Sequence, residues 1–262
     1  MKKTALITGA SSGIGADLAR IHAARGGDLI LIARRQNKLE ALKEELEKAH
    51  GIQVTIMAKD LSVHNAAEDV YQALQEKNIA VDYLINNAGF GGQGYFHERE
   101  WVKDQTMIQL NILALTHLTR LFLPAMVARK SGRILNVASS AGLVPGGPLQ
   151  SVYFATKAYV ISFTNGLAGE LEGTGVTATS LCPGATATEF SQRGGLDKTE
   201  LFKGRVFSSY DVAKDGYEAM LNGELVKLTA LEMAAKISIK MSPLVPRKIV
   251  LRQIKEMQKI KE

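Results

Sequence analysis

The stretch Thr8-Gly9-Ala10-Ser11-Ser12-Gly13-Ile14-Gly15 joins an apolar run at residues 3–8 to a segment with helical periodicity at residues 13–26. Glycines in such a turn let the backbone bend sharply and approach a pyrophosphate, whose charge the N-terminus of the following helix stabilises. The same turn also forms for packing reasons alone, and its GxxxGxG spacing differs from the commonest GxGxxG fingerprint. The stretch therefore indicates the phosphate end of a dinucleotide site between a strand and a helix.

Outward from this turn, apolar strand-like runs alternate with helical segments. Strands are expected at residues 3–8, 28–33, 53–58, 82–85, 133–138 and 176–181, with a short one near residue 225. Strands that alternate with helices form βαβ crossovers, which build a parallel sheet covered on both faces. No repeat or Pro/Gly/Ser-rich linker divides the chain. The sequence therefore predicts a single α/β domain over residues 1–262, with a Rossmann-like doubly wound parallel sheet of about seven strands and helices on both faces.

The composition argues against several classes of protein. The chain has 262 residues, 46% of them apolar and 22% charged, which is typical of a globular domain and not of a disordered chain. Its one cysteine, Cys182, has no partner for an intrachain disulfide, and no signal-peptide core is found, which favours a cytoplasmic protein. The five histidines lack metal-ligand spacing, so no metal site is expected. No uninterrupted apolar run reaches about 18 residues, so no membrane span is expected.

The net charge of +6 is concentrated at the C-terminus. Residues 236–262 include eight basic and two acidic residues, an excess equal to the whole net charge. Residues 1–235 are thus balanced, which argues against nucleic-acid binding. We expect a basic helical extension over residues 228–262, with two helices separated at Pro243 and Pro246. Apolar residues recur at near-helical spacing from 249 to 260, so the last helix packs on its own body or on a partner subunit, or rests on an anionic membrane surface.

The end of the second expected strand bears on the choice of cofactor. Proteins that bind NAD usually place an acidic residue there, to hydrogen-bond the ribose 2′-hydroxyl. Here the sequence reads Ala33-Arg34-Arg35, and guanidinium groups bind a 2′-phosphate with charge-assisted bonds. The alternative is a solvated basic pair at a helix start, which the helix dipole disfavours. The pattern favours NADP(H), with Arg34 as the better candidate and Arg35 expected to point outward.

Tyr153 and Lys157 are four residues apart on a helix expected near residues 151–172, so they project from the same face. Such a pair is more often a surface pair than a catalytic one. A phenol with a pKa of about 10 must lose about three units, or about 4 kcal/mol, to exchange protons near neutral pH. One ammonium group at about 4 Å in an effective dielectric of about 20 supplies roughly that much. We therefore hypothesise that Lys157, helped by a positively charged oxidised nicotinamide, lowers the Tyr153 pKa and makes it a general acid in carbonyl reduction and a general base in the reverse direction.

Two serines follow the strand expected at residues 133–138. Ser139 and Ser140 lie at the carboxyl edge of the predicted sheet, where ligands of open α/β sheets bind. A hydroxyl there can hydrogen-bond a substrate carbonyl. The alternative for each serine is that its hydroxyl simply ends the strand.

Taken together, these residues resemble a classical short-chain dehydrogenase/reductase over about residues 3–190. The cofactor turn of that family matches residues 8–15, its Asp-Leu pair matches residues 60–61, and its Asn-Asn-Ala-Gly segment matches residues 86–89. Its Pro-Gly turn with a following threonine matches residues 183, 184 and 188. The family pattern Ser-x-Ala-Gly fits residues 139–142, which favours Ser139 over Ser140. Each motif is weak alone, but five of them in the family's order make the combination specific.

The resemblance implies a catalytic tetrad of Asn111, Ser139, Tyr153 and Lys157. Lys157 would also hold the nicotinamide ribose, and Asn111 would position a water that resupplies protons through Lys157. From the residues alone, an amide such as Asn111 in an apolar helix is more often a core side chain with satisfied hydrogen bonds. The family also implies a homodimer or homotetramer. The cofactor contacts expected from the residues and the resemblance are Gly9, Ser11, Ser12, Gly13, Ile14, Gly15, Arg34, Arg35, Asp60, Leu61, Asn87, Ala88, Gly89, Tyr153, Lys157, Pro183, Gly184 and Thr188.

The sequence predicts an NADP(H)-dependent oxidoreductase that interconverts a carbonyl compound and a primary or secondary alcohol by hydride transfer. Alternatives are a 3-hydroxy acid dehydrogenase, a 3-ketoacyl or ketosteroid reductase, and, outside catalysis, an NADPH-binding sensor or scaffold, against which the complete tetrad argues. Residues 185–208 are expected to cover the substrate as a lid. The basic residues of this segment favour an anionic substrate; they are Arg193, Lys198, Lys203 and Arg205. Its apolar residues favour an apolar substrate equally well; they are Phe190, Leu201, Phe202 and Phe207.

Overall fold

The computed structural model describes residues 2–196, 199, 202 and 205–259, and within these residues seven parallel strands form one central sheet. The strand order is β3-β2-β1-β4-β5-β6-β9, and every neighbouring pair is parallel. This order is that of a doubly wound Rossmann-like sheet, so the predicted fold is confirmed. The strands are β1 (Thr4–Thr8), β2 (Asp28–Ala33), β3 (Val54–Ala58), β4 (Tyr83–Asn86), β5 (Gly132–Val137), β6 (Val176–Pro183) and β9 (Val226–Thr229).

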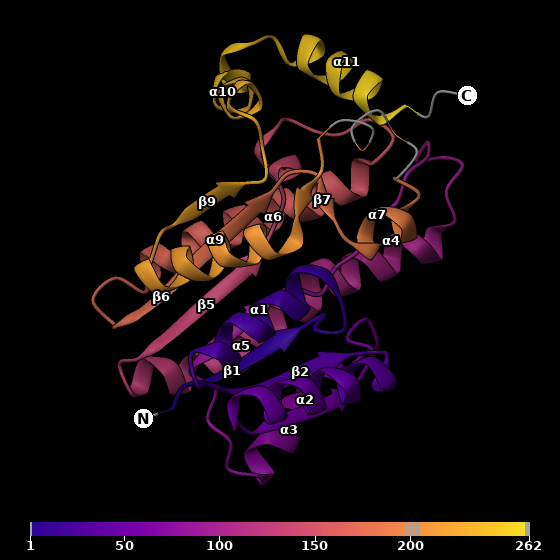
Figure 1. The fold of residues 1–262 in the computed structure, drawn as a ribbon. Coiled ribbons are helices and arrows are strands. Elements are labelled where there is room, and N and C mark those ends of the chain that lie inside the picture. Colours follow the sequence, from indigo (N-terminus) through magenta and orange to yellow (C-terminus); the bar gives the residue numbers. More distant parts are fainter. Residues whose placement is uncertain (1, 197–198, 200–201, 203–204, 260–262) are drawn as a thin grey trace.

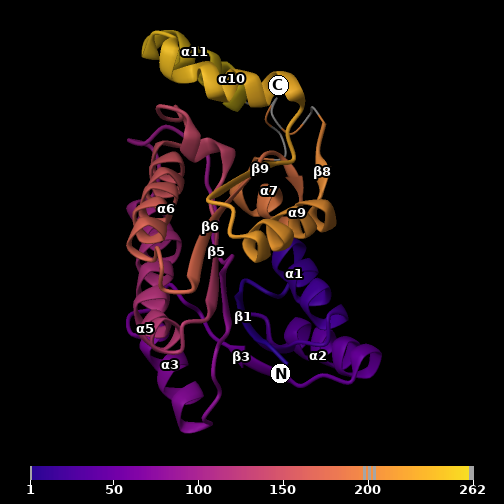
Figure 2. The ribbon, with the colours of Figure 1, turned by 90° about the vertical axis from the view of Figure 1, so that its left-hand side faces the viewer.

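Helices cover both faces of the sheet, as the buried strands require (Figures 1 and 2). One face carries α1 (Gly13–Ala24), α2 (Gln36–His50) and α9 (Ser209–Asn222), which share an apolar core with the sheet. The other face carries α3 (Ala66–Glu76), α5 (Leu115–Ala128) and α6 (Ser151–Glu170), which share a second core. Strands such as β2 read as continuous apolar runs because they are buried from both sides.

One helical stretch bears on the expectation that no segment spans a membrane. Residues 101–128 form α4 (Trp101–Ile108), a π-helix η1 (Gln109–Ala114) and α5 without a break, and this stretch is long and apolar enough to cross a membrane by length and composition. The search for uninterrupted apolar runs missed it because polar residues interrupt the stretch. Leu118, Phe122 and Met126 of α5 pack into the core beneath the sheet, so we interpret the stretch as a core helix.

The last part of the chain lies across the carboxyl ends of the strands (Figures 1 and 2). After β9 come α10 (Met233–Met241), a 3₁₀ turn η3 (Ser242–Leu244) and α11 (Arg247–Gln258), with Pro243 and Pro246 between the two helices. Residue 260 of the expected apolar stripe is outside the described residues. Short segments β7 (Thr186–Ala187), α7 (Glu189–Gly194) and β8 (Phe207–Ser208) belong to the expected lid, in which residues 197–198, 200–201 and 203–204 and the side chain of Arg193 are likewise outside the description.

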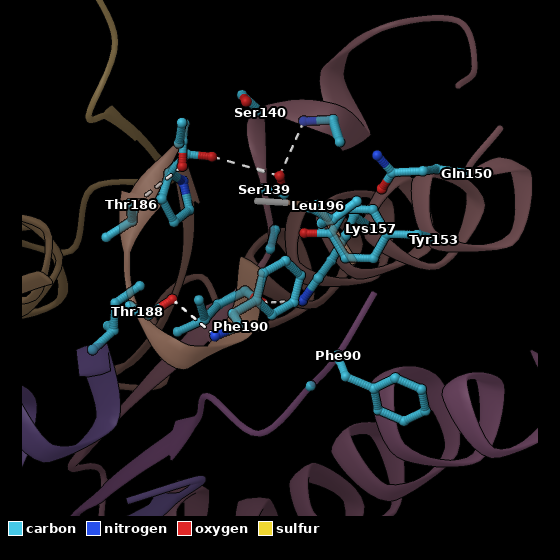
Figure 3. Close-up of a pocket in the computed structure, with 18 of the residues that line it drawn as sticks. Phe90, Ser139, Ser140, Gln150, Tyr153, Lys157, Thr186, Thr188, Phe190 and Leu196 are labelled. Carbon is cyan, nitrogen blue, oxygen red and sulfur yellow. Dashed lines mark hydrogen bonds between the residues drawn. The ribbon is translucent and has the colours of Figure 1, made fainter. Parts of the chain in front are cut away.

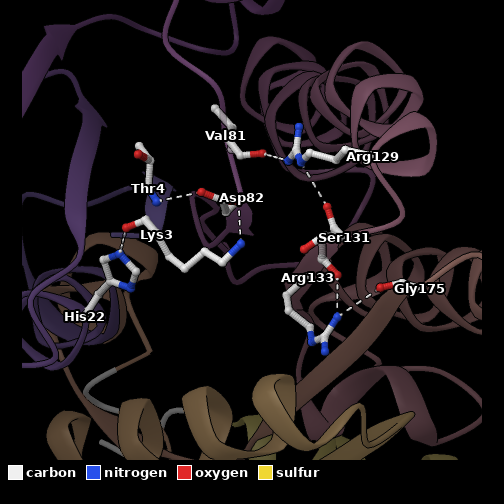
Figure 4. A network of polar contacts seen from close by, with 10 residues as sticks. Lys3, Thr4, His22, Val81, Asp82, Arg129, Ser131, Arg133 and Gly175 are labelled. Carbon is white, nitrogen blue, oxygen red and sulfur yellow. Dashed lines mark hydrogen bonds and ion pairs between the residues drawn. The ribbon is translucent and has the colours of Figure 1, made fainter. Parts of the chain in front are cut away.

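Polar contacts tie the strands together at the opposite, amino-terminal edge of the sheet (Figure 4). The Asp82 carboxylate accepts hydrogen bonds from the Thr4 backbone N–H and the Lys3 ammonium, both at 3.0 Å. Nearby, the buried His22 ring contacts the Lys3 carbonyl oxygen through Nε2 at 2.9 Å and the Tyr217 hydroxyl through Nδ1 at 2.7 Å. This edge therefore joins β1, β4, α1 and α9.

His22 makes the stability of this edge dependent on pH. Burial lowers the pKa of His22 below its ordinary value of 6.5, so the unfolded chain binds a proton at a pH where the folded protein does not. The free energy of unfolding is therefore expected to fall as the pH drops below about 6.5. Urea unfolding at about pH 7.5 and about pH 5.5 checks this, with His22→Gln as the variant that lacks the titrating group. An equal pH dependence in both proteins contradicts the assignment.

Candidate active site

A cavity of about 620 Å³ lies along the carboxyl ends of the strands. The glycine turn after β1 forms one part of its wall, and α10 and α11 contribute another. Every residue expected in the catalytic or cofactor site lines this cavity, with the exceptions of Gly15 and Asn111. The structure thus brings together side chains that the sequence spreads over 180 positions, and it places the two exceptions directly behind the wall.

The glycine turn is shaped by backbone conformation and close contacts. Gly9 and Gly13 have positive φ angles of 67° and 53°, which L side chains rarely adopt. A Cβ at Gly15 would lie only 2.4 Å from the Gly9 carbonyl oxygen, so Gly15 supports the turn from behind. Directly after β4, the backbone N–H groups of Asn87 and Ala88 donate to the Thr8 hydroxyl at 3.0 and 2.9 Å. These contacts hold the turn open toward the cavity.

The N-terminus of α1 faces the cavity beside this turn. Ser12 precedes the helix but makes no side-chain capping bond, and Gly13 and Ile14 line the cavity. Backbone N–H groups at a helix N-terminus bind phosphate oxygens well, and the helix dipole favours their negative charge. The turn therefore fits the pyrophosphate of a dinucleotide.

The arginines after β2 differ from the sequence-based expectation. Arg35 does not point outward: its guanidinium donates to the hydroxyls of Ser11 and Ser12, both at 3.0 Å, and lies 2.9 Å from a Glu189 carboxylate oxygen. Arg34 is 63% exposed and lies 3.8 Å from Asp60. Both arginines line the cavity. No local pattern indicates the Arg35 position, because its partner Glu189 is 154 residues away, on α7.

Tyr153 and Lys157 project from one face of α6 into the cavity (Figure 3). Their exposed fractions are only 8% and 5%, so they are not a surface pair. The Lys157 ammonium donates to the Val137 carbonyl oxygen at 2.8 Å and lies 5.9 Å from the centre of the Tyr153 ring. The lysine is therefore fixed by the end of β5, beside the phenol.

The pKa values of this pair in the protein without cofactor bear on the hypothesis that Lys157, helped by a charged nicotinamide, lowers the pKa of Tyr153. Burial raises the pKa of Tyr153 to about 12, because the phenolate loses its solvation by water. A hydrogen bond with Ser139 opposes this rise only in part. Burial also lowers the pKa of Lys157 to about 8. In the protein alone, burial is thus the largest influence on the pKa of both groups.

Ser139 lies at the end of β5 and begins the 3₁₀ turn η2 (Ser140–Leu143). Its hydroxyl accepts a hydrogen bond from the Ala141 N–H at 3.2 Å and donates to the Pro183 carbonyl oxygen at 3.5 Å (Figure 3). Ser139, and not Ser140, is also the serine whose side chain lowers the pKa of Tyr153. The serine therefore both ends the strand and reaches the phenol.

Asn111 lies in the π-helix η1, not in a regular helix as expected. Its amide nitrogen donates to the Phe90 carbonyl oxygen at 3.0 Å and to the Thr156 hydroxyl at 3.1 Å, and its oxygen accepts from the Phe90 N–H at 3.2 Å. A Cβ at Gly89 would lie 3.0 Å from the Asn111 oxygen and 3.4 Å from the Lys157 nitrogen. Asn111 is thus a satisfied buried amide that also lies next to Lys157, behind Gly89.

Sequence reasoning missed much of the cavity wall. Gln150 precedes Tyr153 by one helical turn, and its amide lines the cavity (Figure 3). Phe90, Val144 and Phe154 form an apolar wall beside Tyr153. No spacing in the sequence marks these residues, because they come from a loop, a 3₁₀ turn and a helix that meet only in the fold.

The sequence of this chain is similar to those of known enzymes. The family model for short chain dehydrogenases matches residues 3–198. The serine 3-dehydrogenase of Agrobacterium fabrum is 36% identical over 242 residues, which cover 89% of this chain and 94% of that protein. The NADP-dependent 3-hydroxy acid dehydrogenase YdfG of Escherichia coli K12 is 38% identical over 190 residues, which cover 71% and 74%. Two further relatives are matched over only 60% and 63% of their length, so this chain spans less than two thirds of them.

Solved structures agree with the fold along nearly the whole chain. A short-chain dehydrogenase from Sphingobium yanoikuyae in complex with NADPH is 33% identical, with a TM-score of 0.82 over 98% of both chains. A short-chain dehydrogenase/reductase from Burkholderia phymatum in complex with NAD is 25% identical, with a TM-score of 0.83 over 100% of this chain and 98% of that one. Both kinds of nicotinamide cofactor thus occur among the similar structures.

Proposed function

Because this chain belongs to the short-chain dehydrogenase family, whose members are nicotinamide-dependent oxidoreductases, we propose that it interconverts a carbonyl compound and its primary or secondary alcohol with NADP(H). One observation carries the proposal. The cavity onto which the glycine turn opens also receives the hydroxyls of Tyr153 and Ser139 and the ammonium of Lys157. A cofactor and a carbonyl substrate can therefore meet at the groups that would handle the proton.

The residues of the cavity fit NADP(H) from end to end. The uncapped N-terminus of α1 would bind the pyrophosphate, and Arg34 and Arg35 would bind the 2′-phosphate. Asp60 and Leu61 would contact the adenine, and Lys157 the nicotinamide ribose. When bound, the cofactor supplies or accepts the hydride. The remaining contacts would come from Asn87, Ala88 and Gly89 after β4 and from Pro183, Gly184 and Thr188 after β6.

The protein would supply the proton and would orient the substrate carbonyl. Tyr153 donates a proton to the carbonyl oxygen in reduction and accepts one from the alcohol in oxidation. Ser139 would hydrogen-bond the same oxygen, since it lines the same part of the cavity as Tyr153. Lys157, held by a hydrogen bond at the end of β5, places a positive charge in the site and would bind the nicotinamide ribose. Asn111 lies behind Lys157, where a water could resupply protons. Tyr153 thus acts as the acid or base, and the other three residues support it.

A direct test is NADPH oxidation against a panel of ketones, aldehydes and 3-oxo acids. Turnover with at least one carbonyl class, absent from a no-enzyme control, supports the proposal. NADPH binding without turnover across the panel overturns it and leaves an NADPH sensor or scaffold. A 3-hydroxy acid dehydrogenase is the second candidate, favoured by the similarity to the Escherichia coli enzyme of that name. A cytoplasmic location and assembly into dimers or tetramers are part of the proposal, and light scattering checks the assembly.

Glu189 is expected to weaken NADPH binding. Its carboxylate pairs with Arg35 and accepts a hydrogen bond from Ser12 at 3.4 Å, where it would repel an incoming phosphate. Glu189→Gln should lower the Kd for NADPH about two- to fivefold at low salt, and less at high salt, because the groups are partly exposed. Fluorescence titration measures the Kd, with Glu45→Gln, which pairs with Arg20 on the surface, as the matched control. A weaker affinity in Glu189→Gln contradicts the expectation.

A further inference from the structure

The part of the cavity around Tyr153 is roofed by the C-terminal extension. Helices α10 and α11 lie over the carboxyl ends of the strands, and side chains from both reach the cavity (Figures 1 and 2). Most of these side chains are apolar, although the extension as a whole is basic. The apolar lining residues of the extension are Leu231, Ala235, Ile239, Val245, Val250, Ile254 and Met257.

The roof packs directly on the residues that surround the reacting phenol. Ile254 of α11 packs against the apolar cluster that contains Met107, Tyr153 and Phe154. The ring of Phe190, on α7, lies 5.6 Å from the ring of Tyr153, centre to centre. The space beside Tyr153 is thus enclosed by apolar groups from α4, α6, α7 and α11.

Buried amides hold α11 in this position. Gln150, one turn before Tyr153, donates from Nε2 to the Gln258 side-chain oxygen, and Gln93 donates to the Gln258 backbone oxygen. Gln150 and Gln258 are each only 3% exposed. The end of α11 is therefore fastened beside the phenol by neutral groups, which add no charge to the chamber.

Apart from Lys157, whose ammonium lies beside Tyr153 and bonds the Val137 carbonyl oxygen, the charged side chains of the described lining lie in other parts of the cavity. Among the described side chains, the cations of the lining are Lys157 and three residues after β2 and β3, namely Arg34, Arg35 and Lys59. The acidic residues of the described lining, Asp60 and Glu189, pair with Arg34 and Arg35. The described lining residues of the roof itself include no cation, so a carboxylate held against the roof would lose its water there without a charged partner, which is costly. An apolar group gains about fourfold in affinity for each methylene it buries.

We propose that the substrate is a bulky, uncharged carbonyl compound, or the matching secondary alcohol, whose apolar body fills the chamber beneath α10 and α11. This inference rests on the proposed function and narrows its substrate class. It favours large neutral ketones over short 3-oxo acids, and it assigns the selectivity to the C-terminal extension.

Matched ketones test the substrate class. We expect kcat/KM for 2-decalone to exceed that for cyclohexanone at least about tenfold, since four more carbons are buried. We expect kcat/KM for the neutral ethyl ester of 4-oxocyclohexanecarboxylic acid to exceed kcat/KM for the free carboxylate by about 100-fold, because the carboxylate would have to lose its water. Turnover that favours the carboxylate, or that is indifferent to size, overturns this inference while the proposed function stands. Absence of NADPH oxidation with every probe overturns the proposed function and this inference with it.

A charge placed in the roof tests the role of the extension. Ile254→Arg puts a cation beside the chamber and should shift the ester-to-carboxylate ratio toward the carboxylate at least about tenfold. Ile249→Arg is the matched control, because Ile249 lies on the same helix and is 50% exposed outside the lining. Met257→Arg repeats the test at a lining position that is 46% exposed and therefore tolerant of a charge. Unchanged ratios in both lining variants, or an equal shift in Ile249→Arg, overturn the assignment to the roof.

Discussion

Tyr153→Phe is expected to lower kcat for ketone reduction by about 10²- to 10⁴-fold, the usual contribution of a positioned general acid. The substitution removes one oxygen atom and keeps the ring that packs against Phe154 and Phe190. The Kd for NADPH and the thermal midpoint should therefore change little. Stopped-flow or steady-state NADPH oxidation measures kcat, and fluorescence titration measures the Kd.

A matched control for this variant lies on the same helix. Tyr159 is 38% exposed, and its hydroxyl bonds to Thr116 on the surface. Tyr159→Phe also removes one phenolic oxygen and should leave kcat within about twofold. If Tyr153→Phe retains the wild-type kcat, Tyr153 is not the acid, whatever the geometry suggests.

Arg34→Ala is expected to raise the KM for NADPH about 10- to 100-fold, because charge-assisted hydrogen bonds to the 2′-phosphate are lost. NADH has no 2′-phosphate, so its KM should change less than about twofold. Arg35→Ala should act in the same direction, since Arg35 lines the cavity beside Ser11 and Ser12.

The ratio of the two KM values is the informative quantity, because a general loss of stability would affect both cofactors equally. Arg20→Ala serves as the control, since Arg20 pairs with Glu45 away from the cavity. Equal effects of Arg34→Ala on NADPH and NADH would remove the argument for the 2′-phosphate.

The sheet was predictable because its strands are buried on both faces. Runs such as Asp28–Ala33 are apolar without interruption, and they alternate with helices of clear periodicity. The expected bounds of the strands from β1 to β6 come within two residues of the observed bounds, and those of β2, where the apolar run and the strand coincide, are identical. The helical stretch at residues 101–128 was harder, because its apolar face mixes with polar residues and contains a π-helix that no local pattern announces.

The candidate site was predictable where one local segment supplies the chemistry. The turn at residues 8–15 and the Tyr153–Lys157 pair are such segments, and Gly9, residues 11–14 and both members of the pair line the cavity. The orientation of Arg35 was not predictable, because it depends on Glu189 from a distant helix. The packing of α10 and α11 over the cavity was not predictable for the same reason. A basic amphipathic helix can pack on its own domain, on a partner subunit or on a membrane, and the sequence alone does not distinguish these.

The pKa of Tyr153 shows why sequence spacing is not enough for electrostatics. Spacing places an ammonium near the phenol, but it says nothing of how deeply both are buried. In the fold, burial raises the pKa of Tyr153 to about 12, and the lysine is held by the Val137 carbonyl. Proton exchange by Tyr153 near neutral pH therefore requires that the positive charge of bound NADP⁺ adds to that of Lys157.

An ultraviolet titration of tyrosinate, taken as the difference between wild-type protein and Tyr153→Phe, tests this requirement most directly. Without NADP⁺, no difference signal is expected up to about pH 10, because burial holds the pKa of Tyr153 at about 12. With saturating NADP⁺, a signal should appear with a midpoint below about pH 9. A Tyr153 that ionises at the same pH with and without NADP⁺ would contradict the account of how this phenol exchanges protons.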